Sequence, residues 1–190
     1  MGTRGMTLVI VNGETKIAQY SQWDNYPEGQ GTTAFRFLQN SKLVDALREK
    51  APLLREANDE DLARVSLEAN VPADKQWVNL EEADRLKKAA PHLDRDMGSK
   101  ILEFVARGLT DFVRTEPEFI EDAVYCEGVF EVNLDENTFS YWSPCYEKHD
   151  AALVGQKLVL KFEDIQSGAV TVEDFISRGD ALYAEDEDED

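Results

Sequence analysis

Residues 7–20 read TLVIVNGETKIAQY, with an apolar, β-branched run before Asn12-Gly13 and a second strand-like run after it. β-Branched side chains favour strands, and Asn-Gly favours the tightest hairpin turn because both residues accept a positive φ. The sequence therefore predicts an N-terminal β-hairpin whose strands are Thr7–Val11 and Thr15–Tyr20.

A second set of strands is predicted towards the other end of the chain. After Pro117 the apolar residues recur at every second position, which is the period of a strand and not of a helix. The strands expected there are Val124–Asn133, Thr138–Trp142 and Leu153–Phe162, with a turn at residues 135–137 between the first two.

Helical patterns fill the region between the two sets of strands. Asn79-Leu80-Glu81-Glu82 resembles a capping box, in which an Asn side chain and an acidic side chain bind backbone amides at the start of a helix. The expected helices begin near Thr32, Ser41, Asp59 and Asn79, continue over Met97–Thr115 as the main core helix, and end with a short one over Val172–Ser177.

This order of elements predicts an α+β fold, in which an antiparallel sheet built from the N-terminal and C-terminal hairpins packs against the central helical segment. Residues 1–183 are expected to form a single domain, because 190 residues are few for two domains. Six consecutive acids run from Glu185 to Asp190, so residues 184–190 are expected to be a disordered acidic tail.

The chain is strongly acidic, with 39 Asp and Glu against 20 Lys and Arg and a net charge of −19. The excess lies in the second half: residues 1–50 have a net charge of +1, and residues 101–150 have one of −9. Binding to phosphate backbones begins with basic residues. The composition therefore argues against direct nucleic-acid binding and against binding to anionic membranes.

The most distinctive polar and aromatic residues lie in the near-neutral N-terminal part, directly after the first hairpin. Aromatic rings offer stacking surfaces, and an arginine can contact a phosphate through two hydrogen bonds. The candidate ligand-binding or partner-binding residues are Arg4, Tyr20, Gln22, Trp23, Asp24 and Tyr26. The alternative interpretation is that Trp23 and Tyr26 only pack this loop onto the core.

The opening MGTRG, together with QY, QWD, YP and GQG within residues 19–31, resembles the start of a family of small uncharacterised proteins of bacteriophage and prophage genomes. The resemblance is confined to the N-terminal part of the chain. It implies a phage origin, a bacterial cytoplasmic setting and an accessory protein that acts against host defence. It implies no catalytic residue.

Three functions follow from these patterns. The first is an anti-CRISPR-like inhibitor, whose acidic surface occupies the basic nucleic-acid-binding groove of a host protein. The second is binding of a small signalling nucleotide by the aromatic loop. The third is hydrolysis, because the layout also resembles that of N-terminal-nucleophile hydrolases, with Thr3 as the candidate nucleophile once cleavage after Gly2 frees its amine.

The remaining residues form no catalytic or metal-binding motif. Two cysteines and two histidines do not match the usual zinc patterns, so no metal or cofactor is expected. His92 follows Pro91 at the end of an expected helix and is interpreted as a surface or capping residue. No run of about 20 apolar residues is present, so a cytoplasmic protein is expected and not a membrane protein.

Overall fold

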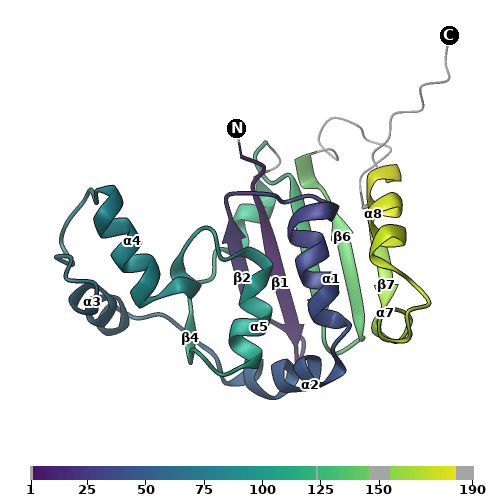
Figure 1. Cartoon of the computed structure of the whole chain (residues 1–190), viewed down its shortest axis with the longest axis horizontal. Helices are drawn as coiled ribbons and strands as arrows, with labels where there is room; N and C mark the ends of the chain where they lie inside the picture. Colours follow the sequence, from purple (N-terminus) through teal and green to yellow (C-terminus); the bar gives the residue numbers. More distant parts are fainter. Residues whose placement is uncertain (1, 123, 146–154, 183–190) are drawn as a thin grey trace, which may run out of the picture.

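A computed structural model describes residues 2–122, 124–145 and 155–182, and the expected tail lies outside these residues (Figure 1). Its centre is a five-stranded sheet with the spatial order β2-β1-β5-β6-β7. The strands are β1 (Gly5–Val11), β2 (Glu14–Ser21), β5 (Gly128–Asn133), β6 (Thr138–Trp142) and β7 (Leu158–Lys161). The predicted α+β fold and both predicted hairpins are confirmed.

The two hairpins meet at β1 and β5. These strands run parallel, with Gly5 opposite Gly128 and Ile10 opposite Asn133, whereas the other pairs of this sheet are antiparallel. This pair is the one departure from the expected antiparallel sheet. After β2 the chain passes through the helices and returns to the end of the sheet where β1 begins, so β5 runs in the same direction as β1.

One carboxylate joins the turns of the two hairpins. Asn12 and Gly13 have φ values of +56° and +72°, the conformation expected of an Asn-Gly hairpin turn. Asp135, in the turn between β5 and β6, accepts hydrogen bonds from both of their backbone amides at 2.8 Å. These contacts hold the first hairpin in register with the second.

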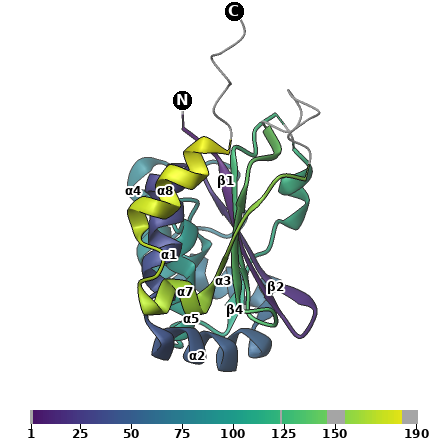
Figure 2. The ribbon, with the colours of Figure 1, turned by 90° about the vertical axis from the view of Figure 1, so that its right-hand side faces the viewer.

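Helices cover one face of the sheet, as Figure 2 shows. They are α1 (Thr32–Leu38), α2 (Ser41–Lys50), α5 (Ile101–Ala106), α7 (Phe162–Ser167) and α8 (Val172–Ala181). Short turns of other helix types lie in the connecting segments, and they are η1 (Pro27–Gly31), η2 (Ala51–Leu53), η3 (Pro91–Leu93) and η4 (Gly98–Lys100). On the opposite face, Phe119 of η5 (Pro117–Glu121) and Cys126 pack on Met6 and Val129.

The prediction of one core helix over Met97–Thr115 is wrong, because α5 ends at Ala106. Gly108 has a φ of +69°, and its amide bonds back to a carbonyl of α5 at 2.8 Å, which is a typical helix stop. Phe112 and Val113 then form β4, which pairs with the short strand β3 (Arg55–Glu56). The apolar pattern was therefore produced by a helix and a strand in succession.

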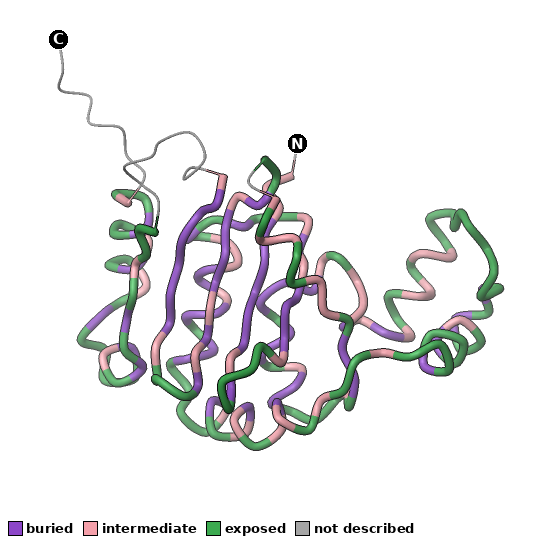
Figure 3. The backbone as a smooth tube through the Cα atoms, turned by 180° about the vertical axis from the view of Figure 1, so that it is seen from behind, coloured by how far each residue is buried: buried purple, intermediate pink, exposed green. Residues whose placement is uncertain are grey.

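Two further helices extend beyond the β2 edge of the sheet, at the left of Figure 1. They are α3 (Asp59–Glu68) and α4 (Leu80–Ala89), and each begins with a capping box, at Asn58 and at the predicted Asn79. Residues 58–90 are called the arm below. Seen from behind in Figure 3, most of the arm is exposed, whereas the strands of the sheet are largely buried.

The core between helices and sheet centres on Phe175 of α8, which is 0% exposed. Its ring lies 5.5 Å from that of Phe35, 5.3 Å from that of Phe139 and 6.4 Å from that of Tyr141. These neighbours come from α1 and β6. One side chain thus joins the last helix to the first helix and to the sheet.

The substitution Phe175→Ala is expected to lower the free energy of unfolding by about 3–5 kcal/mol, the usual cost of removing a buried aromatic ring. Urea denaturation followed by circular dichroism measures the change. The control is Leu53→Ala, because Leu53 is 77% exposed and its truncation leaves no cavity. A Phe175→Ala protein as stable as the Leu53→Ala protein would contradict this description of the core.

Candidate functional site

The N-terminal loop (residues 21–31) connects β2 to α1 and is organised by one buried amide. Asn25 Nδ2 donates to the backbone carbonyls of Thr3 and Ser21 at 2.9 and 3.1 Å. Gln30 Oε1 accepts a hydrogen bond from a backbone amide of η4 at 2.8 Å. The loop is therefore attached both to the chain preceding β1 and to the segment that leads into α5.

Four of the six predicted binding residues form two hydrogen-bonded pairs on this loop and the adjoining end of β2. The Tyr20 hydroxyl donates to Gln22 Oε1 at 2.8 Å. The Tyr26 hydroxyl donates to Asp24 Oδ1 at 3.3 Å, and Tyr26 is 40% exposed. In both pairs the acceptor belongs to a residue two positions away in the chain.

The other two predicted residues lie apart from these pairs. The Arg4 guanidinium lies over the ring of Tyr125, 4.8 Å from its centroid. Trp23 is 45% exposed and packs against Gly2, where a Cβ atom would meet the ring at 2.3 Å. The hydroxyl of Thr3, the candidate nucleophile, accepts a hydrogen bond from the backbone N–H of Asn25 at 3.2 Å.

A pocket of about 270 Å³ lies beside Tyr20 at the free edge of β2. We name it the His92 pocket. The polar residues that line it are Gln19, Tyr20, His92, Arg95, Arg114 and Glu116. Apart from Tyr20, none of these residues belongs to the set predicted from the sequence. They come from three separate parts of the chain, and no spacing in the sequence relates them.

The position of the His92 pocket follows from the backbone of β2. An edge strand exposes unpaired amides and carbonyls unless other segments bond to them. At the end of this strand the Gln22 amide donates to the Arg95 carbonyl at 2.9 Å, and the Ala18 carbonyl accepts from the Glu116 amide at 3.2 Å. The two segments that cover the edge therefore also form walls of the pocket.

The interpretation of His92 as a surface or capping residue is wrong, because the residue is only 6% exposed. Its ring stacks on that of Phe104 at 5.5 Å and meets that of Phe112 edge-on at 4.8 Å. Burial lowers the pKa of His92 below its ordinary value, with the Asp111 charge acting in the opposite direction. The ring is therefore neutral at pH 7.

Because the pKa of His92 is lower in the folded protein than in the unfolded chain, the unfolded chain binds more protons once the pH falls below about 6.5. The free energy of unfolding is expected to fall between pH 7 and pH 5, and to fall less in His92→Gln. Urea denaturation at several pH values measures both slopes. His149 is present in both proteins and cancels in the comparison. Equal slopes would contradict the buried, neutral state of His92.

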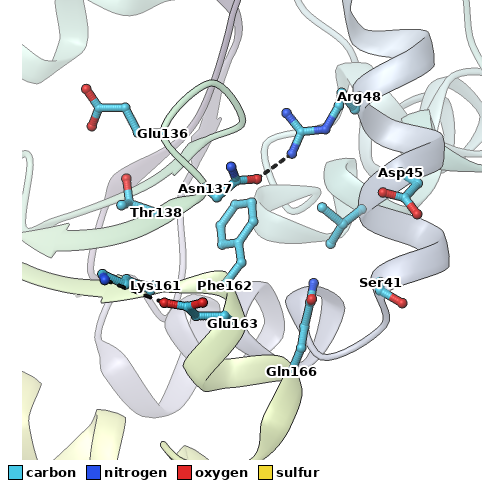
Figure 4. A pocket seen from close by; sticks show the side chains of 11 residues that line it. Ser41, Asp45, Arg48, Glu136, Asn137, Thr138, Lys161, Phe162, Glu163 and Gln166 are labelled. Atoms are coloured by element: carbon cyan, nitrogen blue, oxygen red, sulfur yellow. Dashed lines mark hydrogen bonds and ion pairs between the residues drawn. The ribbon is translucent and has the colours of Figure 1, made fainter.

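A larger pocket, of about 440 Å³, lies between α2, the β5–β6 turn and the start of α7 (Figure 4). Two of its charged side chains, those of Arg48 and Lys161, already have partners. Arg48 donates to the Leu134 carbonyl and to Asn137 Oδ1, and Lys161 lies 3.5 Å from Glu163. The Arg48 contacts attach α2 to the β5–β6 turn, and the Lys161–Glu163 pair joins the end of β7 to the start of α7, so we interpret this pocket as structural.

The arm carries an open apolar groove of about 390 Å³ between α3 and α4. The apolar residues that line it include Leu62, Val65, Val78, Ala83 and Leu86. Trp77 and Leu80, beside Val78 in the sequence, are 85% and 87% exposed. Large apolar side chains that are this exposed and this close together are typical of a surface that contacts another molecule.

The base of the arm is held by an ion-pair cluster around Asp61, a residue that is 4% exposed. Asp61 accepts hydrogen bonds from two arginines, Arg55 and Arg64, and from the Asn58 amide. These groups, led by Arg55, lower the pKa of Asp61 to about 2. Both guanidinium groups also lie over the ring of Phe112. The base of the arm is thereby attached to β3 and β4.

Comparisons with protein-family models, with curated proteins and with solved structures found no match to this chain. In the described part of the chain, no three His, Cys, Asp or Glu side chains are grouped so that they could hold a metal ion. None of the helices described in Figure 1 combines the length and the apolar character that crossing a membrane requires.

Proposed function

We propose that this protein acts by binding another protein, one with a basic surface, through the arm. The observation that carries the proposal is the exposed apolar surface of the arm. Five large apolar residues of the arm are exposed, and they are Leu62, Leu67, Trp77, Val78 and Leu80. Interface hot spots are enriched in Trp, and contact with a partner would remove these side chains from water.

The charges of the arm indicate the chemistry of the partner. Most of its bases are already engaged: Arg64 pairs with Asp61, Lys75 with Glu82, and Lys87 with Asp94 and Asp96. By contrast, no ion pair within the described residues involves the exposed acids Asp59, Glu60, Glu68, Asp74, Glu81 and Asp84. An apolar surface surrounded by unpaired acids is complementary to an apolar spot surrounded by Lys and Arg.

The net charge of −19 strengthens this choice, because a basic partner would be attracted from a distance and bound faster at low salt. The resemblance of the N-terminal residues to phage proteins adds a partner class. A nucleic-acid-handling protein of bacterial defence, such as a CRISPR effector, has the required basic groove, and inhibition would follow from occupying it. The wider acidic surface would then face the rim of that groove.

The test is capture of bacterial host proteins on the immobilised full chain at low salt, with identification by mass spectrometry. A basic protein is expected to bind the wild type and to be released by salt. The double substitution Trp77→Ser, Leu80→Ser is expected to weaken its binding about 30-fold or more, the effect of losing a hot-spot aromatic residue. The control is Leu53→Ser, which removes another highly exposed apolar residue, one that lies outside the arm.

The charge contribution is tested with Glu68→Lys and Asp84→Lys on the arm. Their controls are Asp45→Lys and Glu49→Lys, two exposed acids on α2. The arm pair is expected to weaken binding and the α2 pair to leave it unchanged. The proposal fails if no basic protein is captured, or if the arm substitutions and the control substitutions have the same effect.

A further inference from the structure

Two residues that line the His92 pocket each carry a buried hydrogen-bond acceptor that has no partner within the described residues: Gln19 Oε1 and His92 Nδ1. Gln19 is 5% exposed and His92 is 6% exposed. The other polar atom of the Gln19 amide, Nε2, is already used, because it donates to the Tyr20 carbonyl at 3.1 Å. Buried polar atoms are nearly always hydrogen-bonded, so two unpartnered acceptors on residues that line one pocket indicate a missing donor.

The hydrogen-bond network around His92 assigns Nδ1 as an acceptor. The Thr110 hydroxyl donates its one proton to the Phe112 carbonyl at 2.7 Å. At its 3.3 Å contact with His92 Nε2, the same hydroxyl oxygen can therefore only accept. Nε2 thus carries the proton of the neutral ring, and Nδ1 has a free lone pair.

The remaining polar side chains of the pocket are mainly cationic. Arg95 and Arg114 both line it, together with one acid, Glu116, which pairs with Arg114 at 3.3 Å. No ion pair joins Arg95 to an acid in the part of the chain that the structure describes. In a chain of net charge −19, an unpaired arginine beside a pocket is chemically suited to an anion.

We propose that the His92 pocket binds a small molecule with an anionic group at one end and hydrogen-bond donors at the other. The donors bind Gln19 Oε1 and His92 Nδ1, and the anion lies between Arg95 and Arg114. A nucleoside monophosphate with an amino-bearing base has this chemistry, and so does a free α-amino acid. A volume of about 270 Å³ encloses a molecule of that size or part of one, and does not enclose a dinucleotide.

This site is independent of the proposed protein-binding function, with one shared residue. Arg95 lines the His92 pocket and also the groove of the arm. The test therefore uses Arg114→Ala and Gln19→Met, whose side chains line the pocket and not that groove. Gln19→Met keeps the length of the side chain and removes the acceptor. Its fold is checked by circular dichroism.

The experiment is isothermal titration calorimetry of the full chain, together with its melting temperature in millimolar ligand. The probes are adenosine 5′-monophosphate, the standard α-amino acids one at a time, and inorganic phosphate. We expect one of the first two classes to bind and raise the melting temperature, and phosphate alone to bind at least ten-fold more weakly. Arg114→Ala and Gln19→Met are each expected to weaken that binding about ten-fold or more.

The matched control is Arg36→Ala, which removes an exposed arginine of α1 and is expected to bind as the wild type does. Binding of adenosine 5′-monophosphate would identify the ligand class as a nucleotide, and binding of an amino acid would identify it as an amino acid. The proposal is overturned if none of these probes binds. It is also overturned if the bound probe binds equally to wild type, Arg114→Ala and Gln19→Met, or if phosphate binds as tightly as the larger probes.

Discussion

The parallel pairing of β1 with β5 is the contact on which the rest of the structure depends. It joins two hairpins that are far apart in the sequence, and Asp135 strengthens the junction by bonding to the Asn12 and Gly13 amides. The segment between β2 and β5 returns to the starting end of β1, and α1, α2 and α5 of this segment pack against one face of the sheet (Figure 2). The same pairing leaves β2 at the edge.

That free edge is where both proposed sites arise. The segments around Arg95 and Glu116 bond to the backbone of β2 and protect it, and together with Gln19 and Tyr20 they form the His92 pocket. The arm extends from the same side of the sheet (Figure 1), and the hydrogen bonds of Asp61 hold its base. The body of the protein is therefore a scaffold that presents a small polar pocket next to a larger apolar surface, with Arg95 lining both.

Features with a local cause could be predicted from the sequence. The Asn12-Gly13 turn, the capping box at Asn79 and the second hairpin each depend on residues within a few positions of one another. The single helix expected over Met97–Thr115 does not form, because Gly108 adopts a positive φ just after the end of α5. The parallel pair has no local signal, since it depends on the path of the chain through the helices.

The residues of the candidate site also divide into those with a local signal in the sequence and those without one. Tyr20 and Gln22 were predicted because aromatic and polar residues are concentrated in one stretch; the structure bonds the two side chains to each other, and Tyr20 also lines the His92 pocket. His92, Arg95 and Arg114 were missed because they reach the pocket through tertiary packing against β2. The exposed Trp77 could have been noticed from the sequence as a large aromatic residue within a highly polar segment.

The most direct test of this account is nuclear magnetic resonance of the uniformly labelled chain, which measures proton–proton contacts between strands. The parallel register predicts contacts between Gly5 and Gly128 at one end of the pair and between Ile10 and Asn133 at the other. An antiparallel pair would instead bring Gly5 close to Asn133 and Ile10 close to Gly128. That second pattern would contradict the parallel junction, and with it the placement of the helices, the β2 edge and both proposed sites.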